Sequence, residues 1–312
     1  MQGQDARGAR LAVRARTRGG RVAADVDHAL SGERSLLITW LNRGTLHLVR
    51  SEDYPWLQAL TTPPLQAGNA RRLDQEGVTP NDAERGVRTI ERALAADGPL
   101  TRAQLRERLE SAGVPTAGQA LVHLLMLACL RGIAVRGPTV GKQHAYALVR
   151  DWLGPLREVD HETALTELAR RYLAGHGPAG ERDLARWAGL PLRDVRKGLA
   201  ALGSEIEEVG EGLFALVRRP PTAEPPSPRL LGPFEPVLLG WTSRGDILGS
   251  HTRLVTVNGI FRPFAMAEGR AVATWRLVKG RVEIEPLEPI PAATRAALDA
   301  DAADVERFME SY

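Results

Sequence analysis

Cysteine is nearly absent from this chain of 312 residues, in which Cys129 is the only one. One cysteine cannot form an internal disulfide or supply the thiolates of a cysteine-rich zinc site. Because Cys129 lies within the apolar stretch 120–130, we expect it to be a buried hydrophobic side chain of a cytoplasmic protein.

Long hydrophobic runs are also missing. The stretch 120–130 is the longest, and it is shorter than the roughly 18 residues that a membrane-spanning helix needs. The chain does not open with the charged and then apolar segment of a secretion signal. We therefore expect no membrane partner. The composition, 43% hydrophobic and 25% charged, fits an ordinary globular protein of roughly two or three compact units.

The patterns that mark metal and cofactor enzymes are absent as well. None of the seven histidines pairs with another at the spacing of metal ligands. The chain contains neither a glycine-rich phosphate loop nor a Gly-x-Ser-x-Gly nucleophile motif. We therefore predict that the protein uses no metal and no cofactor.

Lysine is scarce, and the basic residues are almost all arginine. Lysine occurs only at Lys142, Lys197 and Lys279, so that 38 of the 41 basic residues are arginine. A GC-rich genome would produce this bias without a functional cause, and a net charge of +3 does not by itself indicate nucleic acid. The segment 1–21 nevertheless carries six arginines against the single acid Asp5, and the planar guanidinium suits phosphate oxygens.

One series of elements occurs repeatedly upstream of a proline-rich segment. In its clearest copy, 81–149, apolar periodicity predicts a helix over 82–96. The pairs Thr101–Gln104 and Thr116–Gln119 match the capping box that opens a helix, so two more helices are expected. Two short strands follow. This order is typical of the winged helix, an elaborated helix-turn-helix.

Two further copies are less regular. The segment 160–217 repeats three helices and a hairpin, whereas the stretch 35–49 reads as a helix that ends at Arg43-Gly44 and is followed by a strand. The first copy has no room for its opening helices, so we expect it to be incomplete. Beyond the prolines, alternating residues and turns such as Asn258-Gly259 predict antiparallel strands, and a helix closes the chain.

The sequence thus predicts an α+β protein made of tandem winged helices. The expected parts are an incomplete first winged helix (1–72), a second winged helix (80–152), a third winged helix (156–218), a proline-rich linker (219–229) and a β-rich C-terminal domain with a terminal helix (230–312).

The third helix of a winged helix is the usual reader of the DNA major groove. The helix at 120–130 is apolar almost all round, so it should be packed inside. In the last copy, Arg193, Arg196 and Lys197 lie on one side of the corresponding helix. They form either a solvated face or a set of phosphate contacts.

Two other short stretches are candidates for function. Phe261 and Arg262, beyond the Asn258-Gly259 turn, either cover a core or form an aromatic and basic hairpin that wedges a DNA base step. Gln2 and Gln4 would face the same way in an extended chain. They are either polar residues of a chain end or a pair of carboxamides that holds a water. Such a pair is no strong base, and it suits a reaction whose leaving group is already activated.

Four stretches together carry a family resemblance: "QGQDARGA", "ITWLNRGTLHLV", "LLGPFEPVLLGW" and "LVTVNGIFRPFAM". Over essentially its whole length the chain resembles the winged-helix DNA-binding family that contains the AlkZ-type DNA glycosylases. The family's catalytic glutamine–aliphatic–glutamine motif corresponds to Gln2 and Gln4, with Gly3 between them, and Asp5 is a further candidate for polarising the water. The family's DNA-probing hairpin corresponds to "VNGIFRPF".

This resemblance implies a monofunctional glycosylase that hydrolyses the N-glycosidic bond of purines alkylated at N7 or N3, including interstrand crosslinks. Its expected partner is alkylated double-stranded DNA, and we expect a monomer associated with the nucleoid. The candidate phosphate contacts are Arg7, Arg10, Arg43, Arg193 and Arg196. The alternatives are a non-catalytic winged-helix DNA-binding protein or regulator, and an inactive, truncated family member.

Overall fold

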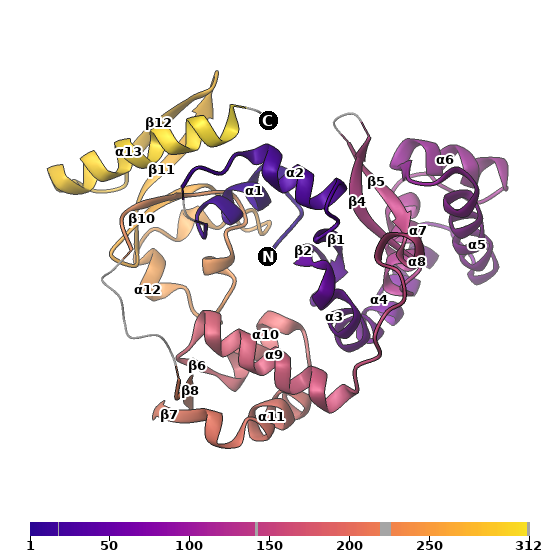
Figure 1. The fold of residues 1–312 in the computed structure, drawn as a ribbon, viewed down its shortest axis with the longest axis horizontal. Helices are drawn as coiled ribbons and strands as arrows, with labels where there is room; N and C mark the ends of the chain where they lie inside the picture. Colours follow the sequence, from indigo (N-terminus) through magenta and orange to yellow (C-terminus); the bar gives the residue numbers. More distant parts are fainter. Residues whose placement is uncertain (18, 141–142, 219–225, 311–312) are drawn as a thin grey trace. The chain divides into compact units, whose positions relative to one another are not determined.

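The structure, a computed structural model, describes residues 1–17, 19–140, 143–218 and 226–310. The described residues form a mixed α+β fold with three antiparallel sheets (Figure 1). The chain divides into two compact units, one made of Asp27–Leu165 and one made of Met1–Val26 together with Thr166–Tyr312. Most of the proline-rich linker expected over 219–229 lies outside the described residues.

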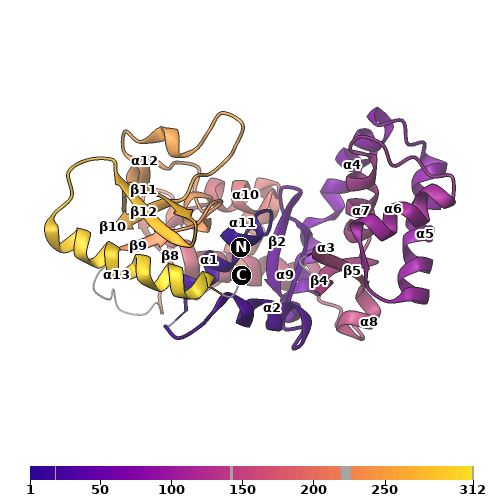
Figure 2. The same cartoon turned by 90° about the horizontal axis from the view of Figure 1, so that it is seen from above.

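The unit Asp27–Leu165 is built on a five-stranded sheet of order β2-β1-β4-β5-β3, and Figure 2 shows four of its helices, α4 to α7, grouped together. Its strands are β1 (Leu36–Leu41), β2 (Thr45–Arg50), β3 (Leu100–Thr101), β4 (Ala134–Val140) and β5 (Gln143–Leu148). Its helices are α2 (Ala23–Ser31, which begins just before the unit), α3 (Tyr54–Thr61), α4 (Pro63–Gln75), α5 (Pro80–Asp97), α6 (Arg102–Ser111), α7 (Ala120–Leu130) and α8 (Val149–Leu153).

The series α5, β3, α6, α7 and hairpin β4–β5 contains the three helices and two strands expected from periodicity, with the short β3 added. The predicted capping box of α6 is confirmed, because Thr101 Oγ1 accepts from the Gln104 amide and Gln104 Oε1 accepts from the Thr101 amide at 2.9 Å. The second predicted box is wrong. Thr116 Oγ1 donates to Glu110, and the Gln119 amide donates instead to the Glu76 carboxylate at 2.8 Å.

Residues 36–41 form a strand, so the helix predicted before Arg43-Gly44 is wrong. β1 pairs with β2 from Leu36↔Arg50 to Leu41↔Thr45, across a tight turn in which Asn42 and Gly44 have φ of 52° and 78°. A short, continuously apolar run fits a buried strand or a buried helix equally well. Pairing with β2 on one side and β4 on the other decides between them.

Helix α7 forms the centre of this unit. Nine of its residues are buried, Cys129 among them, which confirms the prediction that this helix is packed inside. Trp40 of β1 and Tyr146 of β5 belong to the same hydrophobic cluster, with their rings stacked 6.5 Å apart. A helix that is apolar on every side has to be surrounded by other elements.

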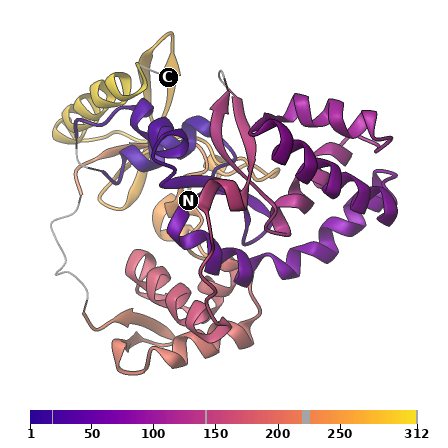
Figure 3. The same cartoon turned by 45° about the vertical axis from the view of Figure 1, so that its right-hand side comes forward.

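The second unit contains a similar series of elements followed by a separate sheet. The series consists of α9 (His161–His176), β6 (Ala179–Gly180), α10 (Glu181–Ala188), α11 (Leu192–Ala201), β7 (Ile206–Gly210) and β8 (Leu213–Leu216). The short strand β6 pairs with β8, just as β3 pairs with β5 in the first series. In Figure 3, the three helices of this series and the hairpin β7–β8 form one group of neighbouring elements.

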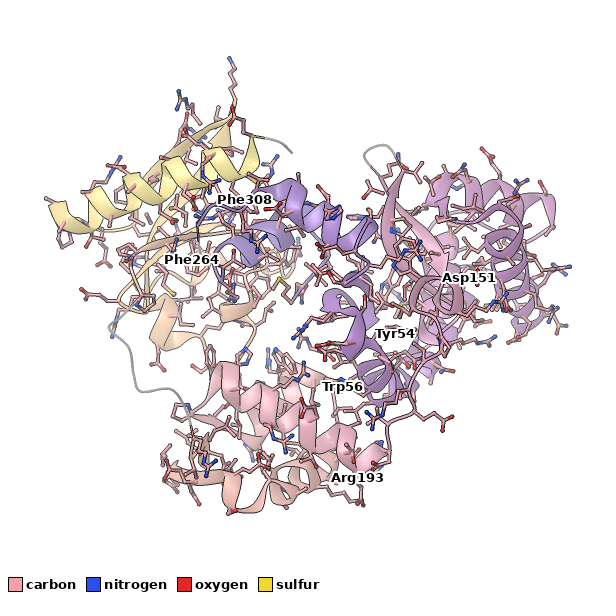
Figure 4. The ribbon with its side chains drawn as sticks, in the orientation of Figure 1. Tyr54, Trp56, Asp151, Arg193, Phe264 and Phe308 are labelled. Atoms are coloured by element: carbon pink, nitrogen blue, oxygen red, sulfur yellow. The ribbon has the colours of Figure 1, made fainter. Side chains whose placement is uncertain are left out.

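The C-terminal part is a four-stranded sheet of order β12-β11-β10-β9, with α13 lying along it (Figure 1). Its elements are β9 (Arg229–Leu231), α12 (Gly245–Leu248), β10 (Phe264–Ala267), β11 (Arg270–Val278), β12 (Arg281–Pro286) and α13 (Ala292–Met309). Phe264 and Phe308, labelled in Figure 4, are fully buried. The predicted strands and terminal helix are confirmed here, except that residues 252–254 form a 3-10 turn before the Asn258-Gly259 loop.

A buried ion pair joins α13 to α1 (Ala6–Arg14), the first helix of the chain. Arg14 is 3% exposed, and its two terminal nitrogens donate to the two Asp301 carboxylate oxygens at 3.0 and 2.8 Å. Arg14 also donates to Asp304 and to the Leu230 carbonyl, while Asp301 accepts from the Leu230 amide and from Arg229. Burial by itself lowers the pKa of Arg14, but the hydrogen bonds and charges of Asp301 and Asp304 outweigh it and hold that pKa above its ordinary value.

We expect Asp301→Ala to lower the free energy of unfolding by about 3–5 kcal/mol, because it leaves the buried Arg14 guanidinium without its main partner. The control is Asp299→Ala on the same helix, whose partner Arg295 is exposed; its effect should stay below about 0.5 kcal/mol. Urea denaturation of the two variants measures the difference. Equal effects would show that the buried pair contributes no more than a surface one.

Candidate functional site

The glutamine pair lies immediately before α1. Asp5 is the N-cap of this helix, and its carboxylate accepts from the Gly8 amide. Gln2 is buried at 8% exposure, whereas Gln4 is exposed. Gln2 Oε1 has no hydrogen-bond partner among the described residues. The motif therefore presents one buried carbonyl acceptor and one exposed amide at the positive end of a helix.

Helix α1 packs very closely on the loop that follows β9. A Cβ atom added at Gly8 would lie 2.4 Å from the Pro233 carbonyl oxygen, and one added at Gly232 would lie 3.0 Å from Leu11. Only glycine at both positions allows the two backbones to approach so closely. This contact fixes the position of α1, and with it the glutamine pair, relative to residues 232–235.

Glu235 is a buried acid in that loop, and the sequence interpretation assigned it no role. Its side chain is 0% exposed, and Oε1 accepts from Arg16 and from the Val237 amide. Oε2 has no partner among the described residues. The sequence could have indicated this buried acid, because Glu235 is the only charged residue within the apolar stretch "LLGPFEPVLLGW".

An aromatic pocket adjoins α9 in the same unit. The His176 ring stacks on Tyr172 at 4.7 Å and meets the edge of Trp241 at 5.3 Å. Burial lowers the pKa of His176, and its Nδ1 lies 3.2 Å from the Tyr172 carbonyl, so the neutral ring donates from Nδ1. His176 and Trp241 border a cavity of about 390 Å³ that also reaches Arg244 and Asp183. Its aromatic faces suit a planar ring.

The cations of α11 lie on an exposed face. The Arg193 side chain, labelled in Figure 4, is 82% exposed, and Lys197 is exposed as well. Arg196 instead forms a two-point pair with Glu181 at 2.7 and 2.6 Å. Arg193 and Lys197 are therefore better placed than Arg196 to contact a phosphate, since Arg196 would first have to leave its carboxylate.

The remaining candidate contacts differ in burial. Arg7 and Arg262 are exposed, and Arg43 is half-buried in the turn between β1 and β2. Arg10 is 3% exposed and donates to the Ala6 carbonyl, so in this structure it is no surface contact. Phe261 is buried as well.

Phe261 packs inward instead of facing solvent. It is 7% exposed, contacts the Phe234 ring at 5.9 Å and lies under the Arg244 guanidinium at 5.2 Å. These contacts favour the core interpretation over the wedge. The exposed apolar side chains of the 255–261 loop are instead Val257 and Ile260, at 106% and 51%. The alternation rule for strands could not predict which of these side chains are exposed, because residues 255–261 form a loop with the isolated bridge Val255↔Phe261 and not two paired strands.

Comparison with known proteins places this chain in a family. Residues 1–308 match the family model described as "DNA glycosylase AlkZ-like". The chain belongs to the AlkZ-like DNA glycosylase family. It is 29% identical over 300 residues to the interstrand DNA cross-link repair glycosylase of Streptomyces sahachiroi, covering 88% of this chain and 79% of the relative. The solved structure of S. sahachiroi DNA glycosylase AlkZ has a TM-score of 0.81 at 26% identity, covering 99% of this chain and 88% of the other.

Members of the AlkZ-like family hydrolyse N-glycosyl bonds, so the resemblance drawn from the four sequence stretches is confirmed, together with the assignment to DNA repair. The substrate of the family is DNA. In the part of the chain that the structure describes, no helix is both long and apolar enough to span a membrane, and no cluster of three or more acidic, histidine or cysteine side chains forms a metal site.

We expect Gly8→Ala to destabilise the protein and to lower any activity that depends on Gln2, because the new methyl group would meet the Pro233 carbonyl and displace α1. Gly175→Ala is the matched control, since a Cβ there meets nothing within 4 Å and α9 is helical; it should be neutral or stabilising by up to about 1 kcal/mol. Thermal melting and circular dichroism compare the two. A neutral Gly8→Ala would contradict the close packing.

Proposed function

We propose that this AlkZ-like protein is a monofunctional glycosylase for purines that carry an alkyl group on N7 or N3. The observation that carries the proposal is the buried Gln2 carbonyl directly before α1, an acceptor that no donor among the described residues reaches and that Gln4 follows two residues later. A buried acceptor of this kind normally holds a water or a ligand group.

The chemistry of an alkylated purine matches neutral amides. Such a base is already cationic, so it leaves with the bond electrons and needs no protonation. The protein has to position water and stabilise the positive charge that develops on the sugar. The carbonyl oxygens of Gln2 and Gln4 can do both.

Interstrand crosslinks belong to the same proposal. The S. sahachiroi relative is named an interstrand DNA cross-link repair glycosylase, and a crosslink through purine N7 atoms presents the same cationic leaving group. The exposed Gln4 is the member of the pair with room for a bulky adduct.

We further propose that the two series of helix, strand, helix, helix and hairpin are winged helices, with the boundaries 80–152 and 156–218 predicted from the sequence. The similar order of elements and the similar pairing of β3 and β6 support this. In this proposal, the exposed cations of α11 contact DNA phosphates, and the 255–261 loop inserts Val257 at its tip.

The decisive experiment is an incubation with a duplex that contains N7-methylguanine, with free base measured by chromatography. We expect release by the wild type and at least about 100-fold slower release by Gln2→Ala/Gln4→Ala, since positioning and charge stabilisation are both lost. Absence of release from the folded wild type would exclude the activity. Equal release from both proteins would exclude only the glutamines.

The DNA-binding face has its own test. Arg193→Gln/Lys197→Gln should weaken binding to all duplexes alike and reduce the slope of log K against log salt by about 2, because two phosphate contacts are removed. Arg276→Gln, an exposed arginine of β11 paired with Glu283, is the control. Fluorescence anisotropy at several salt concentrations gives the slopes. A slope unchanged from the control would place the DNA on another face.

A further inference from the structure

Glu235 carries an unexplained carboxylate oxygen. Its ion pair with Arg16 and its bond from the Val237 amide both use Oε1, while Oε2 is buried and has no partner among the described residues. Elsewhere in the chain the arginine–carboxylate pairs Arg14–Asp301 and Arg196–Glu181 use both oxygens. A purely structural pair gains most from that two-point geometry. The free oxygen of Glu235 therefore indicates a further ligand.

Gln2 presents a second acceptor of the same kind, directly before the helix that packs on the loop of Glu235. Gly8, in the first turn of α1, lies against the Pro233 backbone two residues before Glu235, and Arg16, two residues beyond α1, pairs with Glu235. The carboxylate therefore belongs to the loop that packs along the helix that Gln2 precedes. Gln2 Oε1 and Glu235 Oε2 are thus two buried acceptors, and neither has a donor in the part of the chain that the structure describes. One water molecule has two hydrogens and can donate one to each.

We propose that Glu235 is a further catalytic residue of the glycosylase reaction, which holds the attacking water together with Gln2 and accepts its proton. This inference rests on the proposed function, because it concerns the same reaction at the same glutamines. It supplies the base that a pair of carboxamides lacks.

Hydrolysis of the glycosidic bond conserves atoms and charge. The water oxygen forms a bond to the sugar C1′ as the bond from C1′ to the purine nitrogen breaks. The electron pair of that bond leaves with the base and neutralises its positive charge. One water proton passes to the Glu235 carboxylate and then to solvent, which leaves an abasic sugar and a neutral base. Arg16 keeps Glu235 in place and is a positioning residue.

The experiment uses the full chain and the N7-methylguanine duplex under single-turnover conditions at saturating protein. The variants are Glu235→Gln, which keeps the shape, Glu235→Asp, which keeps the charge, and Glu285→Gln, a control on the exposed face of β12. Three quantities are measured for each protein: the rate constant of base release, the Kd for the duplex and the melting temperature.

We expect Glu235→Gln to slow base release on the order of 100-fold, as for other general bases, with Kd changed by less than about twofold. Glu235→Asp should recover part of that rate, and Glu285→Gln should match the wild type. A Glu235→Gln variant as fast as the wild type would overturn the inference. So would a slow one whose rate the aspartate does not improve, because Glu235 would then act only through packing.

The measurements distinguish failure of the Glu235 inference from failure of the proposed function. A wild type that releases no base overturns the function and this inference with it. A wild type that releases base, a Gln2→Ala/Gln4→Ala variant that does not, and a fully active Glu235→Gln variant overturn the inference alone.

Discussion

The buried pair between Arg14 and Asp301 is the interaction on which the candidate site depends. Helix α1 has only nine residues, too few to be stable alone, so its position has to come from tertiary contacts. Arg14 fixes its last turn to α13 and β9 through two-point hydrogen bonds, and Gly8 lets its first turn lie against Pro233. The glutamine pair directly precedes a helix that is held at its first and last turns, and this fixes the position from which Gln2 and Gln4 project.

The charges around this helix suit a cationic substrate. A positively charged purine would be repelled by bare arginines, yet DNA binding requires them. The arginines at the end of α1 are matched by acids: the buried Arg14 by Asp301 and Asp304, and the exposed Arg16 by the buried Glu235. The exposed cations of α11, which face solvent, remain suited to the phosphate backbone. Under the proposed function, this arrangement combines a basic outer face for DNA with acid-matched arginines near the glutamine pair.

The third helix has a different environment in each of the two repeated series. α7 and α11 are each the third helix of their series, yet α7 is buried almost completely while α11 buries only Val195, Gly198 and Leu199 along one side. α7 lies among α4, α5 and the strand β1, so its apolar surface is covered on several faces. α11 packs mainly on α10, which leaves its arginine side to solvent. The hydrophobic pattern alone separates these two cases, because burial on all sides needs apolar residues on all sides.

Local sequence patterns predicted much of this protein: the order of helices and strands after residue 80, the capping box at Thr101, the burial of Cys129 and the family. They failed where a distant partner decides. Residues 36–41 form a strand because they pair with β2 and β4, and the Gln119 amide donates to Glu76, which lies 43 residues away in the sequence. Arg10 and Phe261 turned inward although their residue types suited a surface contact. The free oxygens of Gln2 and Glu235 appear only in three dimensions, because a sequence records which groups are polar but not which of them lack a partner once buried.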